Sequence, residues 1–155
     1  MIAFFVYNLN LYSGAAQQAH LLASTLESPV VIFNHERGNK KISYCTKGNI
    51  QTINLPQNKL KALTCLVYLI FKKPIKIFHL HGFFVHGIIF GWLLNKKIVL
   101  KTTLTGSDDF QTLFSKYNNK YWLRFLLSRV DVNVCLTQQL FDINSRHFDA
   151  KKIVI

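Results

Sequence analysis

Short apolar runs alternate along this chain with stretches in which apolar residues follow a helical spacing. The runs Ile2–Val6 and Pro29–Phe33 have the length of buried strands, and polar residues follow each of them. Between the two runs, apolar residues recur every three or four positions from Ala15 to Leu26, which predicts an amphipathic helix. A polar loop with Gly14 at its end separates the first strand from this helix.

The same alternation continues to the end of the chain. Further strands are predicted at 42–46, 50–55, 75–82, 96–103, 130–137 and 151–155. Further helices are predicted at 57–71, at 83–94, in a mixed region at 108–129, and from Thr137, as the capping residue, to about 148. The turn Lys47-Gly48-Asn49 permits a local hairpin. This order predicts one α/β, Rossmann-like domain over residues 1–155, with a largely parallel sheet and helices on both faces.

The position of a ligand site follows from this fold class. In an open parallel sheet, ligands bind beyond the carboxyl ends of the strands. We therefore expect the loops after Val6, Phe78 and Thr102 to share one cleft. The candidate residues on these loops are Asn8, Ser13, Gly14, His79, His81, His86, Thr105, Ser107, Asp108 and Asp109.

Three histidines gather after the strand that contains HLHG. His79 and His81 alternate to the same face, and His86 lies five residues further on. No carboxylate or cysteine joins them at a familiar metal-binding spacing, so we expect no metal. A polar wall for a hydroxylated ligand is the favoured interpretation. A structural histidine bonded to the backbone is the alternative for His79.

The segment TGSDD has a structural interpretation. Ser107 or Asp108 is expected to cap the following helix, and the carboxylates suit the positive end of that helix. This duty removes the need to interpret Asp108 and Asp109 as a catalytic pair.

The glycine at the start of the first helix has two interpretations. Backbone N–H groups at a helix start can bind a phosphate, and Gly14 would allow the ligand to approach closely. However, SGAAQQ matches neither the dinucleotide-binding nor the NTP-binding glycine pattern, so a simple turn glycine remains equally open.

The net charge of +12 is the strongest compositional feature of the 155 residues. With 50% hydrophobic and 17% charged residues, the chain has the composition of a globular domain. The positive excess predicts attraction to nucleic acid, to an anionic membrane or to a phosphorylated ligand, with ordinary surface lysine as the alternative.

The segment KYNNKYWLRFLLSR places much of this charge among aromatic residues. If it forms one helix, Lys116, Lys120 and Arg124 share a face, and Trp122 lies among the neighbouring aromatics. These four residues would then face an anionic membrane surface. A half-buried surface helix with solvated lysines is the alternative.

The cysteines and the apolar runs indicate the cellular context. The three cysteines include no C-x-x-C pair, which favours buried, reduced thiols in a cytosolic protein. The start of the chain lacks the charged region of a secretory signal, and the longest apolar runs are shorter than the roughly 18 residues that a spanning helix needs. We expect a cytoplasmic protein, soluble or peripheral at the inner face of the plasma membrane.

These pieces, in this order, resemble the amino-terminal half of a family-four glycosyltransferase of the GT-B fold. The family's opening strand, glycine-rich loop and first helix are similar to YNLNLYSGAAQQAHLLASTL, and its D-I-[IV]-H-x-H strand with the next helix is similar to KIFHLHGFFVHGIIFGWLL. Its P-V-V-x-T-x-H-G-x-D segment resembles KIVLKTTLTGSDD. Its A-D-x-[IV]-[IV]-x-[LV]-S segment resembles VDVNVCLTQQLFD, and the strand before its second domain resembles KKIVI.

The resemblance implies a retaining, hexosyltransferase-type reaction in surface polysaccharide biosynthesis. A sugar would pass from a nucleotide-sugar donor to a glycan or lipid-linked acceptor. This chain would be the acceptor-side domain, and the C-terminal nucleotide-sugar domain is absent from the sequence, so we expect the chain to be inactive alone. No cofactor is implied besides the donor substrate, and no catalytic residue is identified in this chain.

The resemblance also implies roles for single residues. Gly14 and Ser13 would lie at the donor diphosphate, and Ser13 stands where a glycine is common in the family. His81 and His86 would line the acceptor side of the cleft.

The loop TLTGSDD would form the sugar-binding rim of that cleft. Thr105 occupies the place of the histidine in the family's T-x-H-G. A threonine hydroxyl can hydrogen-bond a sugar hydroxyl, but it cannot take up a proton or a positive charge near neutral pH as a histidine can. Ser107 and Asp108 belong to the same acceptor- or sugar-binding set.

Two other classes of function remain open from the sequence. The first is a non-catalytic, membrane-recruiting subunit that works beside a separate catalytic chain. The second is a nucleic-acid-binding module, which the charge allows, but no RNA- or DNA-binding motif is present and we expect no specific nucleic acid. The apolar strand KIVI at the end of the sequence predicts that a second domain follows, whereas natural termination there would favour the subunit.

Overall fold

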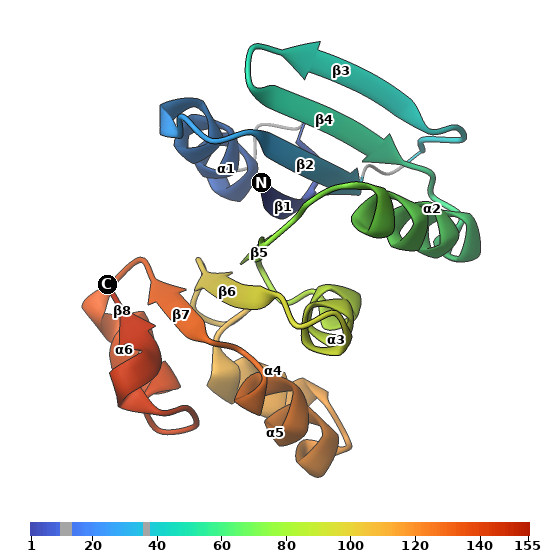
Figure 1. Cartoon of the computed structure of the whole chain (residues 1–155). Coiled ribbons are helices and arrows are strands. Elements are labelled where there is room, and N and C mark those ends of the chain that lie inside the picture. Colours follow the sequence, from blue (N-terminus) through green and yellow to red (C-terminus); the bar gives the residue numbers. More distant parts are fainter. Residues whose placement is uncertain (10–13, 36–37) are drawn as a thin grey trace. The chain divides into compact units, whose positions relative to one another are not determined.

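The structure is a computed structural model, and it describes residues 1–9, 14–35 and 38–155, with only the backbone of Lys59. The chain divides into two units, Met1–Phe78 and His79–Ile155 (Figure 1). The predicted position of Ser13 lies outside the described residues.

Four strands form the sheet of the first unit. They are β1 (Ile2–Tyr7), β2 (Val30–His35), β3 (Ser43–Lys47) and β4 (Ile50–Leu55), in the spatial order β3-β4-β2-β1. β2 pairs in parallel with both β1 and β4, while β3 and β4 form the predicted antiparallel hairpin. Gly48 turns this hairpin with a φ of +59°, a backbone conformation that suits glycine. The hairpin prediction is confirmed, and β3 lies at the outer edge with all five residues exposed.

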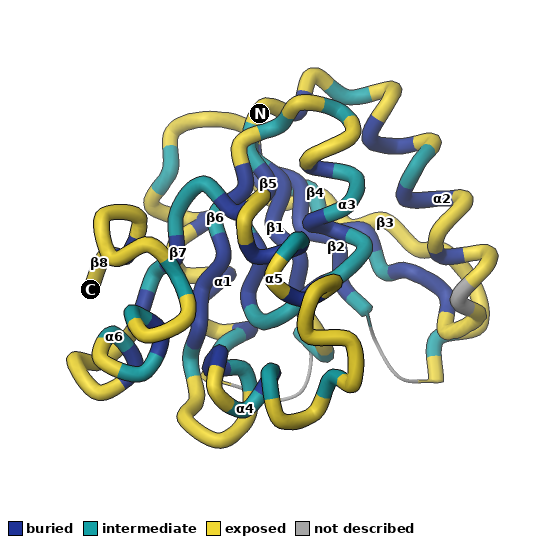
Figure 2. The backbone as a smooth tube through the Cα atoms, turned by 90° about the horizontal axis from the view of Figure 1, so that it is seen from below, coloured by how far each residue is buried: buried dark blue, intermediate teal, exposed yellow. Residues whose placement is uncertain are grey.

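Two helices complete the first unit, α1 (Gly14–Thr25) and α2 (Lys59–Lys72). Ala19 and Ala23 of α1 pack in one core cluster with Phe4 and Ile32 of β1 and β2, because small side chains let the helix lie close to the sheet. The interior of β1 and the first five residues of β2 are buried (Figure 2), as expected for strands that read as continuous apolar runs. Asn58 caps α2 by accepting a hydrogen bond of 3.1 Å from the Lys61 amide.

The strands of the second unit are β5 (Ile77–His81), β6 (Lys97–Thr102), β7 (Val132–Cys135) and β8 (Ile153–Val154), in that spatial order. β5 begins with the last two residues of the first unit. β6 pairs in parallel with β7, and β7 with β8.

The helices of the second unit are α3 (Val85–Leu93), α4 (Phe110–Lys116), α5 (Lys120–Ser128) and α6 (Gln138–Asn144), followed by the short 3-10 helix η1 (Ala150–Lys152). A Cβ on Gly87 of α3 would stand 2.7 Å from Cδ2 of Leu80. The glycine therefore allows α3 to approach β5 closely. Thr137 caps α6 by accepting from the Leu140 amide, which confirms that prediction.

The described residues together form eight strands in a mostly parallel sheet and six α-helices. This arrangement confirms the predicted α/β, Rossmann-like fold class. The common cleft predicted for the loops after β1, β5 and β6 draws on residues of both units, and it remains a prediction.

Candidate functional site

In the first unit, a row of side-chain amides fixes the point where the chain leaves β1. The Leu9 amide donates to Oδ1 of Asn34 at 2.9 Å, and Nδ2 of Asn34 donates to Oδ1 of Asn54 at 2.8 Å. Nδ2 of Asn54 then donates to Oγ of Ser43 at 2.9 Å. The row connects β3, β4 and β2 with the segment after β1. Because Asn34 is fully buried, its bonds to Leu9 and Asn54 hold this segment firmly.

Gly14 is the first residue of α1 and is exposed. A Cβ added to it would meet nothing within 4 Å, so packing within the described residues does not require a glycine there. Its predicted contact with a donor diphosphate remains a prediction.

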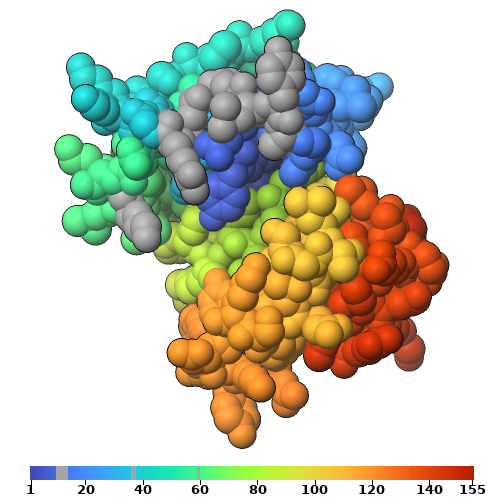
Figure 3. All heavy atoms as spheres, turned by 180° about the vertical axis from the view of Figure 1, so that it is seen from behind, coloured from blue at the N-terminus to red at the C-terminus, as the bar shows by residue number. Residues whose placement is uncertain are grey.

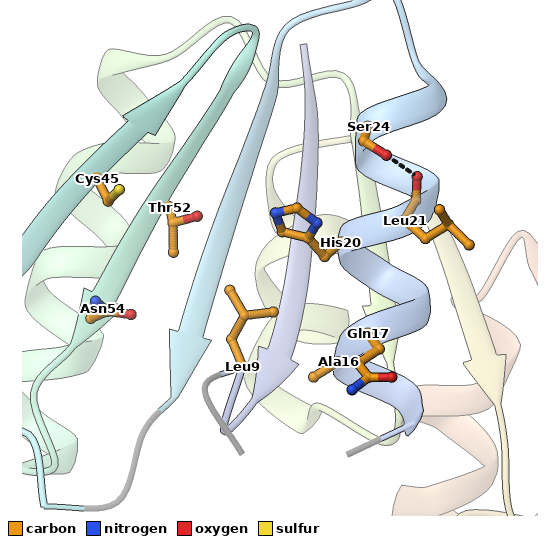
Figure 4. A pocket seen from close by; sticks show the side chains of 9 residues that line it. All are labelled: Leu9, Ala16, Gln17, His20, Leu21, Ser24, Cys45, Thr52 and Asn54. Carbon is orange, nitrogen blue, oxygen red and sulfur yellow. Dashed lines mark hydrogen bonds between the residues drawn. The ribbon is translucent and has the colours of Figure 1, made fainter. Parts of the chain in front are cut away.

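A groove of about 490 Å³ lies between α1 and the β3–β4 hairpin (Figure 4). Polar side chains from both sides line it, including Gln17 and His20 of α1 and Thr52 and Asn54 of β4. The sequence did not indicate this groove, because it forms between segments that are distant in the chain.

In the second unit, His79 and His81 lie on one face at the end of β5, as the strand alternation predicted. Their ring centroids are 4.6 Å apart. Burial, together with the charge of Lys101, lowers the pKa of His79 to about 4, so this imidazole is neutral at pH 7. A neutral imidazole both donates and accepts hydrogen bonds, which suits the recognition of hydroxyl groups.

Lys101 is a buried residue of β6 that the sequence reasoning missed as a site residue. Burial lowers its pKa. Its carbonyl accepts a 3.0 Å hydrogen bond from the Gly82 amide, at a glycine with a φ of +99°, so the chain turns away from β5 beside β6. The sequence feature that could have identified this residue is its cation, which directly follows the apolar residues Ile98–Leu100 within the predicted strand 96–103.

His86 lies in the first turn of α3, where its ring meets the Phe84 ring edge-on with centroids 5.6 Å apart. Burial lowers the pKa of His86. His81 and His86 both belong to the second unit. At the end of β5, the ring of His81 contacts the ring of His79.

The loop between β6 and α4 is organised by its two carboxylates. Asp108 accepts from the Thr103 amide at 2.9 Å, from the Thr103 hydroxyl at 3.1 Å and from the Leu104 amide at 2.8 Å. Thr105 and Ser107 are exposed on this loop. Asp108 therefore shapes the rim that carries these two hydroxyls, and their predicted contacts with a sugar remain a prediction.

The prediction that Ser107 or Asp108 caps the next helix is wrong, because Asp109 is the cap of α4. Asp109 accepts from the Thr112 amide at 2.8 Å, from the Thr112 hydroxyl at 2.7 Å and from the Gly106 amide. Burial raises the pKa of Asp109, but these hydrogen bonds outweigh it and lower the pKa below its ordinary value. Both aspartates thus serve the loop.

A buried amide network holds α4 against α6 and the two strands beside it. Oδ1 of Asn144 accepts from the Phe110 amide at 2.9 Å, while its Nδ2 donates to Thr102 Oγ1 at 3.1 Å and to Asn133 Oδ1 at 3.0 Å. Asn133 in turn donates to the Leu100 carbonyl at 2.9 Å. The network positions the start of α4, and with it the loop 103–109.

The single helix that would place Lys116, Lys120 and Arg124 on one face does not form. α4 ends at Lys116 and α5 begins at Lys120, where Asn119 provides a new cap by accepting from the Trp122 amide at 2.9 Å. Lys120 and Arg124 still lie one turn apart on α5, whereas Lys116 belongs to the other helix. Figure 3 shows the segment 110–128, in orange, at the surface.

Two observations on the described residues concern metals and membranes. No group of three or more His, Cys, Asp or Glu side chains in the described ranges is arranged to hold a metal ion. Within the same ranges, no helix has the length and apolarity that a bilayer span requires.

The fold defined above is that of known sugar-transferring enzymes. The chain is similar to sucrose-phosphate synthase from Thermosynechococcus elongatus, with a TM-score of 0.69 and 12% identity over 99% of this chain and 46% of that one. It is also similar to α,α-trehalose 6-phosphate synthase from Burkholderia multivorans, with a TM-score of 0.60 and 10% identity over 97% of this chain and 43% of that one. Both are GT-B glycosyltransferases, so the likeness supports a GT-B-like fold.

This chain spans less than half the length of these two solved proteins. At such low identity the likeness establishes the fold alone. No family model matches the sequence, and no curated protein matches it.

Proposed function

We propose that this chain is the acceptor-binding, N-terminal domain of a retaining, hexosyl-transferring family-four glycosyltransferase. The supporting observation is that 99% of the chain superimposes on 46% of sucrose-phosphate synthase, as one half of a two-domain enzyme would. The names of both similar proteins describe enzymes that make phosphorylated disaccharides. In the proposed reaction, a sugar passes from a nucleotide-sugar to a glycan or lipid-linked acceptor in surface polysaccharide biosynthesis, at the cytoplasmic face of the membrane.

The second unit supplies groups that suit a hydroxylated acceptor. His79 is neutral at pH 7, so it offers hydrogen bonds without a charge, and it lies beside His81. His81 and His86 are the proposed acceptor contacts. Thr105 and Ser107 add exposed hydroxyls on the rim that Asp108 shapes.

The proposed division of labour explains why the chain would be inactive alone. A departing nucleoside diphosphate needs electrostatic stabilisation, which contributes most of the catalysis in such a reaction. In the proposal, Gly14 at the start of α1 approaches the diphosphate, and the nucleotide-binding domain provides the remaining hydrogen-bond donors to it.

Binding of unlabelled ligands to the ¹⁵N-labelled chain tests this proposal by NMR. Neutral oligosaccharides are expected to shift resonances of His81, His86 and the loop 103–109, with millimolar affinity. Nucleotide-sugars alone are expected to bind much more weakly. Thr105→Val should weaken oligosaccharide binding several-fold, because it removes a hydroxyl while keeping the shape. Val154→Thr, which makes the reverse exchange at an exposed residue of β8, is the control.

Two outcomes would contradict the proposal. One is a panel of neutral glycans that shifts no resonance in the second unit. The other is nucleotide-sugar binding that is tight and needs only this chain, because that would place the donor site here.

A second candidate is a non-catalytic subunit that recruits a separate catalytic chain to the membrane. The observation that favours it is the surface of α5, where Tyr121 is 87% and Trp122 42% exposed beside Lys120 and Arg124. The reading frame beyond codon 155 separates the two candidates. A second α/β domain there supports the transferase, and a stop codon supports the subunit.

A further inference from the structure

The outer face of α2 is an apolar surface that no function described above uses. One side of this helix is buried, through Ala62, Cys65, Leu66, Leu69 and Ile70. The opposite side is also apolar, with Leu60 73% and Phe71 70% exposed. A helix that is apolar all round is normally covered on every side, so this outer face is suited to a partner.

Exposed and half-buried apolar side chains form a continuous row on this face. Leu60, Leu63, Val67 and Phe71 are separated by three or four residues, so they follow one stripe over about 16 Å of helix. Tyr68 lies along the edge of the row and is also exposed. We call these five residues the α2 stripe.

Cations border the α2 stripe. Lys61 and Lys72 are exposed on the same helix, and Nζ of Lys72 stands 4.8 Å from the centre of the Tyr68 ring. The contact with Tyr68 raises the pKa of Lys72, which keeps its ammonium group charged.

More cations lie at the start of the helix, and no acid offsets them in the sequence. The Gln57 amide donates to the Asn39 carbonyl at 2.7 Å, which places the exposed Lys40 and Lys41 close to that end. The sequence contains no acidic residue between Glu36 and Asp108.

From this arrangement we propose that the α2 stripe docks in the plane of an anionic membrane. The apolar row would enter the boundary between headgroups and acyl chains, while Lys61 and Lys72 contact anionic headgroups. A second copy of the chain fits less well, because pairing two such faces would bring lysines together without a compensating acid. The proposal does not depend on the transferase activity.

The α2 stripe is better suited to this role than α5, where the sequence predicted membrane contact. The Trp122 ring stacks on the Phe125 ring at 5.3 Å, and the Arg129 guanidinium covers Phe125 and Trp92 at 4.7 and 4.8 Å. The rings of α5 are therefore largely engaged within the second unit. Tyr121 is the large side chain of α5 that remains most exposed.

Tryptophan fluorescence distinguishes the two surfaces directly. The chain contains two tryptophans, Trp92 and Trp122, and both belong to the second unit. With vesicles of phosphatidylglycerol and brominated phosphatidylcholine, the emission of the unchanged chain is expected to be little quenched. Phe71→Trp adds a reporter on the α2 stripe, and this added emission is expected to shift to the blue and to be strongly quenched.

Co-sedimentation with the same lipids, without bromine, measures the contribution of each group. Leu60→Gln/Phe71→Gln is expected to reduce the vesicle partition coefficient at least tenfold. Lys61→Gln/Lys72→Gln should reduce it by about fivefold for each lysine and weaken its dependence on salt. Leu21→Gln/Leu93→Gln changes two equally exposed leucines elsewhere, and Lys120→Gln/Arg124→Gln changes two cations of α5. Both control pairs should leave binding within twofold.

Each outcome decides the proposal. Quenching of the added tryptophan together with loss of binding in the α2 variants supports it. Strong quenching of the native tryptophans, or loss of binding only in the α5 variant, would move the membrane contact to α5 and overturn it. Absence of vesicle binding, with a mass in sedimentation equilibrium that falls when the α2 stripe is changed, would identify a face for self-association instead.

Discussion

At the scale of single residues, His79 shows how surroundings determine charge. Burial is the main reason for its low pKa, and the positive charge of Lys101 adds to the effect. The ammonium group of Lys101 opposes protonation of His79, because a second positive charge nearby is disfavoured. The end of β5 thus presents an uncharged imidazole at neutral pH.

The low pKa of His79 predicts a pH dependence of stability. Because the pKa falls from 6.5 to about 4 on folding, the unfolded chain takes up this proton first as the pH drops. The free energy of unfolding should therefore be unaffected above pH 6.5 and should fall by at most about 3 kcal/mol between pH 6.5 and 4. His79→Gln should flatten the urea-unfolding profile in this range.

A direct check is the NMR titration of the His79 ring, which should have its midpoint near pH 4. Lys101→Met should move the midpoint upward, because it removes the nearby charge. A midpoint near the ordinary value in the unchanged chain would contradict the prediction.

The helix cap Asp109 gives a second prediction for a single residue, which concerns the free energy of unfolding. Asp109→Ala removes the cap of α4 and the acceptor of the Gly106 amide, so it should reduce the free energy of unfolding by about 2 kcal/mol at pH 7. Because its folded pKa is lowered, the contribution of the unchanged carboxylate is present above pH 4 and is lost as the pH falls below it.

Urea unfolding at pH 7 and at pH 3 measures this difference. Asp109→Asn, which keeps a capping oxygen, should lose less at pH 7 than the alanine variant. An equal loss at both pH values in Asp109→Ala would show that the carboxylate charge has no part in it.

Several residue positions were predictable because they depend on local geometry. Alternation along a strand places His79 and His81 on one face, whatever the rest of the fold does. The cap of α4 was not predictable, because Ser107, Asp108 and Asp109 all have suitable side chains. Which of the three residues caps α4 depends on Asn144, which lies 34 residues beyond Phe110 and accepts a hydrogen bond from the Phe110 amide.

At the scale of elements, the buried network around Asn144 connects α6 with α4, β6 and β7. Its members come from four elements, and each is almost fully buried. Buried amides of this kind specify one arrangement of the elements, because a shifted helix would leave their polar atoms without partners.

Removal of this amide should therefore have a large effect. Asn144→Ala deprives the Phe110 amide, Thr102 and Asn133 of a partner, and it should lower the free energy of unfolding by about 2–4 kcal/mol. Asn144→Asp keeps the shape but places an acceptor where a donor is needed, so it should also be destabilising at neutral pH. Chemical unfolding measures both, with Gln138→Ala on the exposed start of α6 as the control.

The opposite result would revise the description of these elements. A loss of less than 1 kcal/mol in Asn144→Ala would show that the network does not determine the position of α4.

The residues at which helices begin and end were less predictable than the presence of the helices. The break between α4 and α5 contains the pair Asn118-Asn119, and Asn119 caps α5. The sequence carried this signal, but the shared face of Lys116, Lys120 and Arg124 was conditional on one helix through all three. The two-helix arrangement separates Lys116 from Lys120 and Arg124.

At the scale of the whole molecule, the charge is the dominant property. A net charge of +12 attracts any polyanion through counterion release, without regard to sequence. The fold itself was predictable, because the alternation of apolar runs with helical spacing does not depend on distant contacts. The burial of Lys101 and the groove beside α1 were not, because both arise only when strands and helices come together.

The charge predicts how the chain behaves toward nucleic acid. Oligonucleotides of unrelated sequence should bind with similar affinity near 20 mM salt and lose at least about tenfold in affinity by 200 mM. Fluorescence anisotropy with three labelled sequences measures this. A strong preference for one sequence that persists at 200 mM salt would instead indicate a specific nucleic-acid site.

The outer edge of β3 is exposed, and the lysines near it, Lys40, Lys41 and Lys47, are therefore also important for solubility. Among the described strands, β3 pairs with β4 alone, so the backbone groups of its other edge are open to another strand. Lys40 and Lys41 precede this edge, and Lys47 ends it, so two copies approaching edge to edge would repel each other. Neutralising these three lysines would therefore expose the protein to aggregation, and aggregated protein pellets in a centrifuge whether or not vesicles are present.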